Sequence, residues 1–330
     1  MAEVAIIGAG AWGTALAVLL ARNAHATVLC ARRPEQLHAM RAARENLAHL
    51  PGIELPAELE LTADWIGAVG NASTVVMAVP SSHARAAITP IAHAIPRSAT
   101  IVSVTKGIEQ DSLCTMTQML AELAPPAGRI AVLSGPGFAA EVGRGKPAAI
   151  VAAARQHKVA ARVQNLFAVK TLRVYRSSDV IGVELGGAAK NVIAIAAGVN
   201  DGLELGSSAR AALITRGLAE MMRLATAAGA RRETMAGLAG LGDLVLTCTG
   251  DSSRNRSLGL RIGRGEPMPL PVPDAPIAEG FANANSVRKL AERLKVEMPI
   301  VFAVYRLLYE AAPANAMVEE LLSRELKTEF

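Results

Sequence analysis

The first residues of the chain carry a glycine motif that strongly restricts the fold. Val4 to Ile7 is a short β-rich run, Gly8, Gly10 and Gly13 follow with the spacing G-x-G-x-x-G, and Thr14 to Asn23 has the pattern of a helix. In such a unit the first glycine permits a tight turn, the second lets a pyrophosphate approach the backbone, and the third lets helix and strand pack closely. The segment therefore predicts a Rossmann-type domain in which these three glycines bind NAD(P).

The next 150 residues alternate between strand and helix patterns. Such alternation predicts an α/β fold with a doubly wound, mostly parallel sheet and helices on both faces. Residues 46–56 (NLAHLPGIELP) are expected to form a loop because two prolines and a glycine interrupt them. The predicted strands are 26–30, 74–79, 101–105, 130–133, 148–151 and 171–175, and the predicted helices are 35–45, 82–94, 112–123 and 156–168.

Helical patterns replace the strand signals after about residue 180. We therefore predict an NAD(P)-binding Rossmann domain at residues 1–180, followed by an all-helical substrate-binding and catalytic domain at residues 181–330. Residues 265–276 contain five prolines and are expected to form a loop. The predicted helices are 183–199, 208–228, 231–238, 254–263, 284–294, 299–311 and 315–326.

Two arginines follow the second predicted strand. An NAD-selective domain usually has a carboxylate there, about 20 residues after the glycines, to bind the ribose hydroxyl. Here the strand ends in Ala31-Arg32-Arg33. Since two guanidinium groups can pair with a 2′-phosphate, NADPH is favoured over NADH as the cofactor. The alternative is that both arginines belong to a solvated surface turn.

Charge and cysteine content exclude several function classes. The net charge is +5, without a run of lysine or arginine and without interleaved aromatic residues, so nucleic-acid binding has little support. Cys30, Cys114 and Cys248 are far apart and form no C-x-x-C pair, which fits a reducing cytoplasm and argues against a cysteine-based metal site. No segment has 18 uninterrupted apolar residues, so we expect no membrane span.

A single lysine lies in a helical stretch that is apolar on nearly every side. Lys190 occupies the middle of residues 182–200, and Gly186, Gly187 and Ala194 share its face at helical spacing. Because these neighbours are small, another backbone or a ligand can approach the ammonium group. Burial lowers the pKa of a lysine, which makes Lys190 a candidate acid/base. The alternative is a lysine that extends its amine to solvent.

A second polar group follows at residues 240–256 (GLGDLVLTCTGDSSRNR). Ser253, Arg254 and Asn255 stand where a helix should begin, and together they offer a hydroxyl, an arginine fork, an amide and free backbone N–H groups. This combination suits a phosphate. The alternative is an ordinary serine N-cap. Lys106 and the loop 134–139 follow predicted strands, so both should border the crevice at the carboxyl ends of the sheet.

Several long motifs resemble one enzyme family. They are GAGAWGTALA at the N-terminus, the Asn46–Pro56 loop, TKG at Thr105–Gly107, SGPxFAxE at Ser134–Glu141, ELGGAAKNVIAIAAG, AALITRGLAEM, GLGDLVLTCT, SRN and AEG at Ala278–Gly280. In these motifs the chain is similar to the bacterial-type NAD(P)-dependent glycerol-3-phosphate dehydrogenases. The resemblance implies a cytoplasmic oxidoreductase that interconverts dihydroxyacetone phosphate and sn-glycerol 3-phosphate for phospholipid synthesis.

The resemblance also implies roles for individual residues. Lys190 would be the catalytic acid/base, and Asp243 would orient Lys190 or a substrate hydroxyl, of which we favour the first. The substrate would be bound by Lys106, Gly135, Gly137, Lys190, Asp243, Ser253, Arg254 and Asn255. Besides the three glycines and Arg33, the cofactor would contact Ala11, Trp12, Arg32, Lys106, Ala139, Arg254 and Glu279. Three features depart from the family pattern: Gly137 replaces serine or threonine, Ser208 replaces asparagine, and the proline-rich 265–276 replaces a helix.

Two other functions remain open at this level. One is a different two-domain β-hydroxyacid-type dehydrogenase, which would act on carboxylates and need no phosphate. The other is a catalytically silent NAD(P)-sensing protein, which would need no lysine in its crevice. The expected binding partner is a small phosphorylated substrate. The chain could also form a homodimer.

Overall fold

The computed structural model describes residues 3–124, 127–267, 278–325 and 328, and its N-terminal half is built on one eight-stranded sheet. The strand order is β10-β9-β8-β7-β6-β1-β2-β5, and each described pair is parallel except β8–β9. The mostly parallel, doubly wound sheet is therefore confirmed. Its strands are β1 (Val4–Ile7), β2 (Thr27–Cys30), β5 (Glu60–Thr62), β6 (Thr74–Met77), β7 (Thr100–Ser103), β8 (Ile130–Ser134), β9 (Ala148–Ala154) and β10 (Leu172–Ser177).

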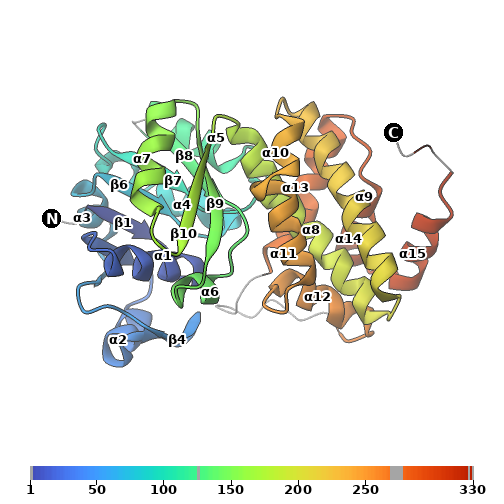
Figure 1. Cartoon of the computed structure of the whole chain (residues 1–330), viewed down its shortest axis with the longest axis horizontal. Helices are drawn as coiled ribbons and strands as arrows, with labels where there is room; N and C mark the ends of the chain where they lie inside the picture. The colour runs from blue at the N-terminus through green and yellow to red at the C-terminus, as the bar shows by residue number, and fades with distance from the viewer. Residues whose placement is uncertain (1–2, 125–126, 268–277, 326–327, 329–330) are drawn as a thin grey trace.

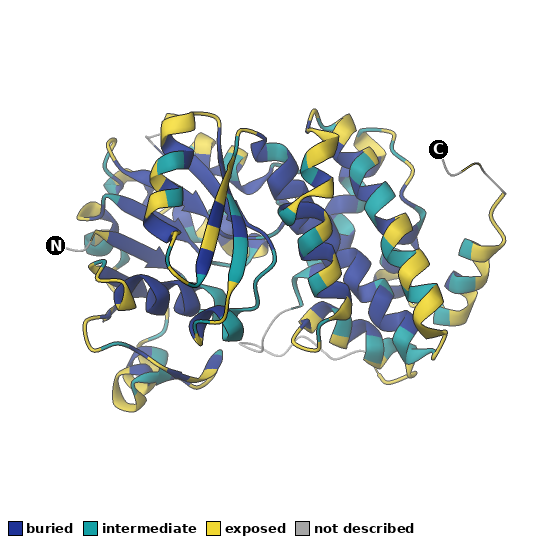
Figure 2. Cartoon of the chain, in the orientation of Figure 1, coloured by how far each residue is buried: buried dark blue, intermediate teal, exposed yellow. Residues whose placement is uncertain are grey.

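Helices cover both faces of this sheet, on the left side of Figure 1. The central strands are buried along their whole length, as their continuous apolar runs require. Figure 2 shows these strands almost entirely in the colour of buried residues. The helices are α1 (Ala11–Arg22), α2 (Pro34–Ala43), α3 (Trp65–Gly70), α4 (Ala84–Ile88), α5 (Met116–Leu123), α6 (Ala139–Gly143) and α7 (His157–Phe167), with 3-10 turns η1 (Ser81–His83), η2 (Ala92–Ala94) and η3 (Ala127–Arg129).

The structure corrects three local predictions in this half. Residues 46–56 are not simply a loop, because β3 (Glu45–Asn46) and β4 (Leu50–Glu54) pair as an antiparallel hairpin. The helix predicted at 82–94 is divided into η1, α4 and η2, since Pro90 lacks a backbone N–H. The helix predicted from residue 112 begins only at Met116, where Thr115 and Gln118 form a capping box.

The C-terminal half packs around one long central helix, α8 (Val180–Gly202). The other helices are α9 (Gly206–Ala227), α10 (Arg232–Ala236), α11 (Asp243–Thr249), α12 (Arg254–Gly263), α13 (Glu279–Arg293), α14 (Pro299–Tyr309) and α15 (Ala314–Leu322), with a π-helical turn η4 (Leu238–Gly242). The helical C-terminal domain is confirmed, although the sequence analysis missed α11. Most of the predicted loop 265–276 lies outside the described residues. The boundary at residue 180 stays a prediction, and the change from β10 to α8 supports it.

α8 is long and apolar enough to cross a membrane by length and composition alone. In the folded molecule, however, 83% of its most apolar 18-residue segment is buried inside the protein. Figure 2 shows α8 enclosed by the surrounding helices. This burial is what the core helix of a globular domain requires, and it places Lys190 in the protein interior.

Glycines allow α12 to cross α8 at backbone contact. A Cβ at Gly259 would lie 1.9 Å from the carbonyl oxygen of Ile195, and a Cβ at Gly198 would lie 2.0 Å from the carbonyl oxygen of Arg256. Any larger side chain at either position would force the helices apart. The crossing thus fixes the N-terminus of α12 relative to α8 and to Lys190.

Gly259→Ala is therefore expected to destabilise the protein, although alanine favours helices more than glycine does. Overpacking at such a contact costs about 1–3 kcal/mol. Urea-induced unfolding measures this loss, with Ser257→Ala, an exposed position on the same helix, as the control. Equal or higher stability of Gly259→Ala would contradict the close crossing.

Candidate functional site

One buried carboxylate joins the two halves of the molecule. Lys190 Nζ lies 2.6 Å from Asp243 Oδ1, and Lys106 Nζ lies 2.6 Å from Asp243 Oδ2. The Asp243 side chain is 1% exposed and that of Lys190 is 6% exposed. Lys106 follows β7 of the sheet, whereas the other two residues belong to α8 and α11. The structure therefore brings together three residues that the sequence analysis selected separately.

Further hydrogen bonds hold both ammonium groups in place. Lys190 Nζ donates to Thr247 Oγ1 at 2.6 Å, and this hydroxyl donates to the backbone carbonyl of Asp243 at 2.6 Å. Lys106 Nζ donates to the Gly135 carbonyl at 3.1 Å. The sequence analysis did not select Thr247. Its position one helical turn after Asp243 was the available signal, because residues four apart share a helix face.

The surroundings of Lys190 shift its proton equilibrium. The pKa of Lys190 is lowered from its usual 10.5 to about 8: burial is the largest cause, Asp243 opposes it, and the nearby Lys106 acts in the same direction as burial. The charged form loses more from desolvation than it gains from the carboxylate. Lys190 can therefore gain and lose a proton close to neutral pH.

The three residues predicted to bind a phosphate lie at the N-terminus of α12. Ser253 is its N-cap, and its hydroxyl accepts from the backbone N–H of Arg256 at 3.2 Å. Asn255 Nδ2 donates to Asn191 Oδ1 at 2.9 Å, and Asn255 Oδ1 accepts from the Gly280 N–H at 2.9 Å. Arg254 is exposed and lines a groove. Ser253 therefore caps α12, as the alternative interpretation of this segment predicted. Arg254, the next residue, lines the groove.

This groove of about 810 Å³ follows the glycine motif and ends at the helical domain. Of the predicted cofactor contacts, the sheet domain contributes Gly8, Gly10, Ala11, Trp12, Arg32 and Arg33, and the helical domain contributes Arg254 and Glu279. The predicted contacts Gly13, Lys106 and Ala139 are not among its described lining residues. Ala139 begins α6, and a Cβ at Gly137 would lie 3.3 Å from the Trp12 ring.

The shape of the glycine turn fits a pyrophosphate. Gly8 has φ +113°, and a Cβ there would lie 2.7 Å from the Ala78 carbonyl oxygen, so only glycine fits. Gly10 lines the groove, and no described atom lies within 4 Å of the position of its Cβ. Gly10 is also the N-cap of α1 and has no side chain to occupy the first N–H groups of that helix. A phosphate can therefore approach the positive end of α1.

Glu279, the first residue of α13, also lines the groove. Burial raises the pKa of its carboxyl group, while the positive charges of Arg254, Lys106 and Lys190 oppose this shift. The groove and the lysine pair are therefore electrostatically connected. Within the described residues, no group of three or more His, Cys, Asp or Glu side chains could hold a metal ion.

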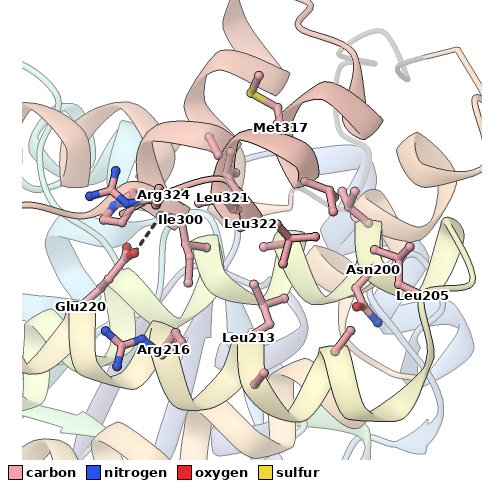
Figure 3. Close-up of a pocket in the computed structure, with 18 of the residues that line it drawn as sticks. Asn200, Leu205, Leu213, Arg216, Glu220, Ile300, Met317, Leu321, Leu322 and Arg324 are labelled. Atoms are coloured by element: carbon pink, nitrogen blue, oxygen red, sulfur yellow. Dashed lines mark hydrogen bonds between the residues drawn. The ribbon is translucent and has the colours of Figure 1, made fainter. Parts of the chain in front are cut away.

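A second cavity, of about 820 Å³, lies between α8, α9, α14 and α15 (Figure 3). It is mostly apolar, and its described lining residues include none of the predicted site residues. Glu220 lines it and accepts from the N–H groups of Ile300 and Val301 at the start of α14. Burial raises the pKa of Glu220 to about 7. Size does not distinguish the two cavities, so the chemistry of the lining identifies the candidate active site.

Comparison with known families decides the assignment. A family model described as NAD-dependent glycerol-3-phosphate dehydrogenase N-terminus matches residues 3–160, and the corresponding C-terminus model matches residues 179–319. The chain belongs to the NAD-dependent glycerol-3-phosphate dehydrogenase family. It is therefore an NAD(P)-dependent oxidoreductase, and both the sensing protein and the β-hydroxyacid dehydrogenase are excluded as its function.

Individual relatives support the same family over the full length. The glycerol-3-phosphate dehydrogenase [NAD(P)+] of Geobacter sp. (strain M21) is 52% identical, and the alignment covers 100% of this chain and 99% of the relative. The relative of the same name from Thiobacillus denitrificans is 47% identical over 99% of this chain and 100% of its own length. Both alignments therefore span the sheet domain and the helical domain.

Solved structures agree with the family and separate it from its neighbours. The crystal structure of glycerol-3-phosphate dehydrogenase from Coxiella burnetii is 38% identical, with a TM-score of 0.90 over 97% of this chain and 98% of that chain. A ketopantoate reductase from Ralstonia eutropha has a TM-score of 0.63 at 19% identity, covering 96% and 99% of the two chains. The second likeness shows a shared fold alone.

Asp243→Asn should strongly destabilise this dehydrogenase, because the buried Lys190 and the partly buried Lys106 would lose their only carboxylate ion-pair partner among the described residues. Breaking a buried ion pair from one side typically costs about 3–5 kcal/mol. Urea unfolding measures the effect, with the exposed Asp111→Asn as the matched control. If Asp243→Asn and Asp111→Asn lose the same stability, the ion pairs of Asp243 do not stabilise the contact between the two domains.

Proposed function

We propose that Lys190 is the acid/base in the interconversion of dihydroxyacetone phosphate and sn-glycerol 3-phosphate. The observation that carries this proposal is the Lys190–Asp243–Lys106 cluster, whose two lysines act electrostatically on Glu279 of the groove that follows the glycine motif. A lysine with a pKa of about 8 is suited to exchange protons near neutral pH.

Bound NAD(P)H would supply the hydride that reduces the ketone carbon. Reduction leaves a negative charge on the former ketone oxygen, and Lys190 Nζ would donate a proton to that atom. In the oxidative direction, neutral Lys190 would accept the hydroxyl proton. Asp243 and Thr247 would hold the amine in one orientation, because each contacts Nζ at 2.6 Å. Lys106 would add a second positive charge near the same oxygen.

The substrate phosphate would bind at the N-terminus of α12. Arg254 supplies a fork that can contact two oxygens at once, and the helix end supplies backbone N–H groups. Ser253 and the second N–H of Asn255 would complete the site. Gly135 and Gly137 would form the wall opposite, beside Lys106 and Trp12.

The cofactor would lie along the groove, with Ala11, Trp12, Ala139 and Glu279 as contacts. Arg32 and Arg33 line the same groove, so we propose that NADPH binds more tightly than NADH. We further propose a cytoplasmic enzyme that supplies glycerol 3-phosphate for phospholipid synthesis. The oligomeric state stays a prediction, and a homodimer is the arrangement to test.

Lys190→Ala is expected to lower kcat by about 10²–10⁴-fold, the usual contribution of a general acid. Cofactor affinity should hardly change and serves as the folding control. In the wild type, kcat/KM for ketone reduction should fall as the pH rises through about 8, because the ammonium form is the donor. A variant within tenfold of wild-type kcat would disprove the role.

Replacing Arg32 and Arg33 with serine should weaken NADPH binding by roughly 2–4 kcal/mol, judging from charged hydrogen bonds. NADH has no 2′-phosphate, so its affinity should hardly change. Fluorescence titration with both cofactors measures the difference, with the exposed Arg155→Ser as the control. Equal losses for the two cofactors would show that the arginines are structural.

A further inference from the structure

α8 carries two anchor points on one face. Asp201 lies eleven residues after Lys190, which is about three helical turns and roughly 16 Å along the axis. The two side chains therefore point to nearly the same side of the helix. Lys190 serves the reacting end of the substrate, whereas Asp201 contacts the helix that carries the proposed phosphate site.

Arg256 makes this contact. Its Nε and Nη2 lie 2.8 and 2.7 Å from Asp201 Oδ2. Its Nη1 lies 3.0 Å from Asp251 Oδ1, and its backbone N–H donates to Ser253 Oγ. Arg256 thus touches both ends of the segment 251–253, which leads into α12. Its side chain is 16% exposed and that of Asp201 is 10% exposed, so solvent screens this pair less than a surface pair.

Two further contacts complete the arrangement. Arg210 of α9 donates to Asp201 Oδ1 at 2.8 Å, which holds the carboxylate from the other side. Asn255 donates to Asn191, the residue next to Lys190. The start of α12 is therefore attached to α8 near both Lys190 and Asp201.

We propose that Arg256 and Asp201 are a positioning pair that sets the distance between the Lys190 ammonium and the phosphate-binding N-terminus of α12. This inference rests on the proposed function of Lys190 and Arg254. Neither member of the pair contacts the reacting atoms. Their effect is to hold the phosphate so that the ketone oxygen reaches Lys190, which matters only for a substrate that carries a phosphate.

Arg256→Lys and Asp201→Asn test the pair. The first keeps the charge and removes the fork, and the second keeps the shape and removes the charge. Arg261→Lys is the matched control, because Arg261 lies on the same helix and forms an exposed ion pair with Glu266 at 2.7 Å. Steady-state kinetics with dihydroxyacetone phosphate and with dihydroxyacetone, inhibition by inorganic phosphate, and thermal unfolding are measured for each protein.

Both variants should lose on the order of tenfold to 100-fold in kcat/KM for dihydroxyacetone phosphate, the size expected for a misplaced substrate. Inhibition by inorganic phosphate should weaken, while the slow turnover of dihydroxyacetone and the behaviour of Arg261→Lys should stay at wild-type levels. The double variant should lose no more than the worse single variant, because both act through one contact.

Equal losses on both substrates would show a purely structural ion pair and overturn the proposal, as would wild-type kinetics in both variants or the same loss in Arg261→Lys. If the wild type itself does not reduce dihydroxyacetone phosphate, the proposed function fails and this inference fails with it. If the wild type is active and Arg256→Lys and Asp201→Asn behave like the wild type, only the proposal of a positioning pair is disproved, and the proposed function is unaffected.

Discussion

The sharing of Asp243 between Lys190 and Lys106 is the interaction on which the structure depends. One carboxylate faces two ammonium groups in the protein interior, so the cluster keeps an excess of positive charge. A buried excess charge is costly for folding but attracts an anionic substrate and stabilises negative charge on an oxygen. The same contact fastens the end of β7 to α8 and α11, so the electrostatics of the site and the docking of the domains have one origin.

α8 provides the rigid reference for this arrangement. Its glycines and alanines let α12 approach at backbone contact, and Gly187 lies against the side chains of Ser134 and Lys106 of the sheet domain. The glycines beside Lys190 also serve close packing, because Gly186 lies against the backbone carbonyl of Ala239. The cofactor groove depends on α8 less, because its glycine turn is defined by β1, α1 and Ala78.

Local patterns in the sequence predicted the sheet, the helical domain and the separate candidate residues. The glycine spacing and the apolar helix with one lysine are features of a few adjacent residues, so they can be recognised directly. The contact between Lys106 and Asp243 joins residues 137 positions apart, and only the packed fold defines it. The β3–β4 hairpin was not predicted because a proline and a glycine interrupt the alternation of apolar and polar residues that identifies a strand. Thr247 was missed because its helix, α11, was not predicted, so its position one turn after Asp243 could not be used.

The position of Lys106 on the sheet domain makes the charge of the cluster depend on the contact between the two domains. Within the helical domain, Asp243 faces Lys190 in a one-to-one ion pair. The excess positive charge arises only when the sheet domain docks and adds Lys106. A movement that separated the two domains would therefore also remove one of the two ammonium groups from Asp243.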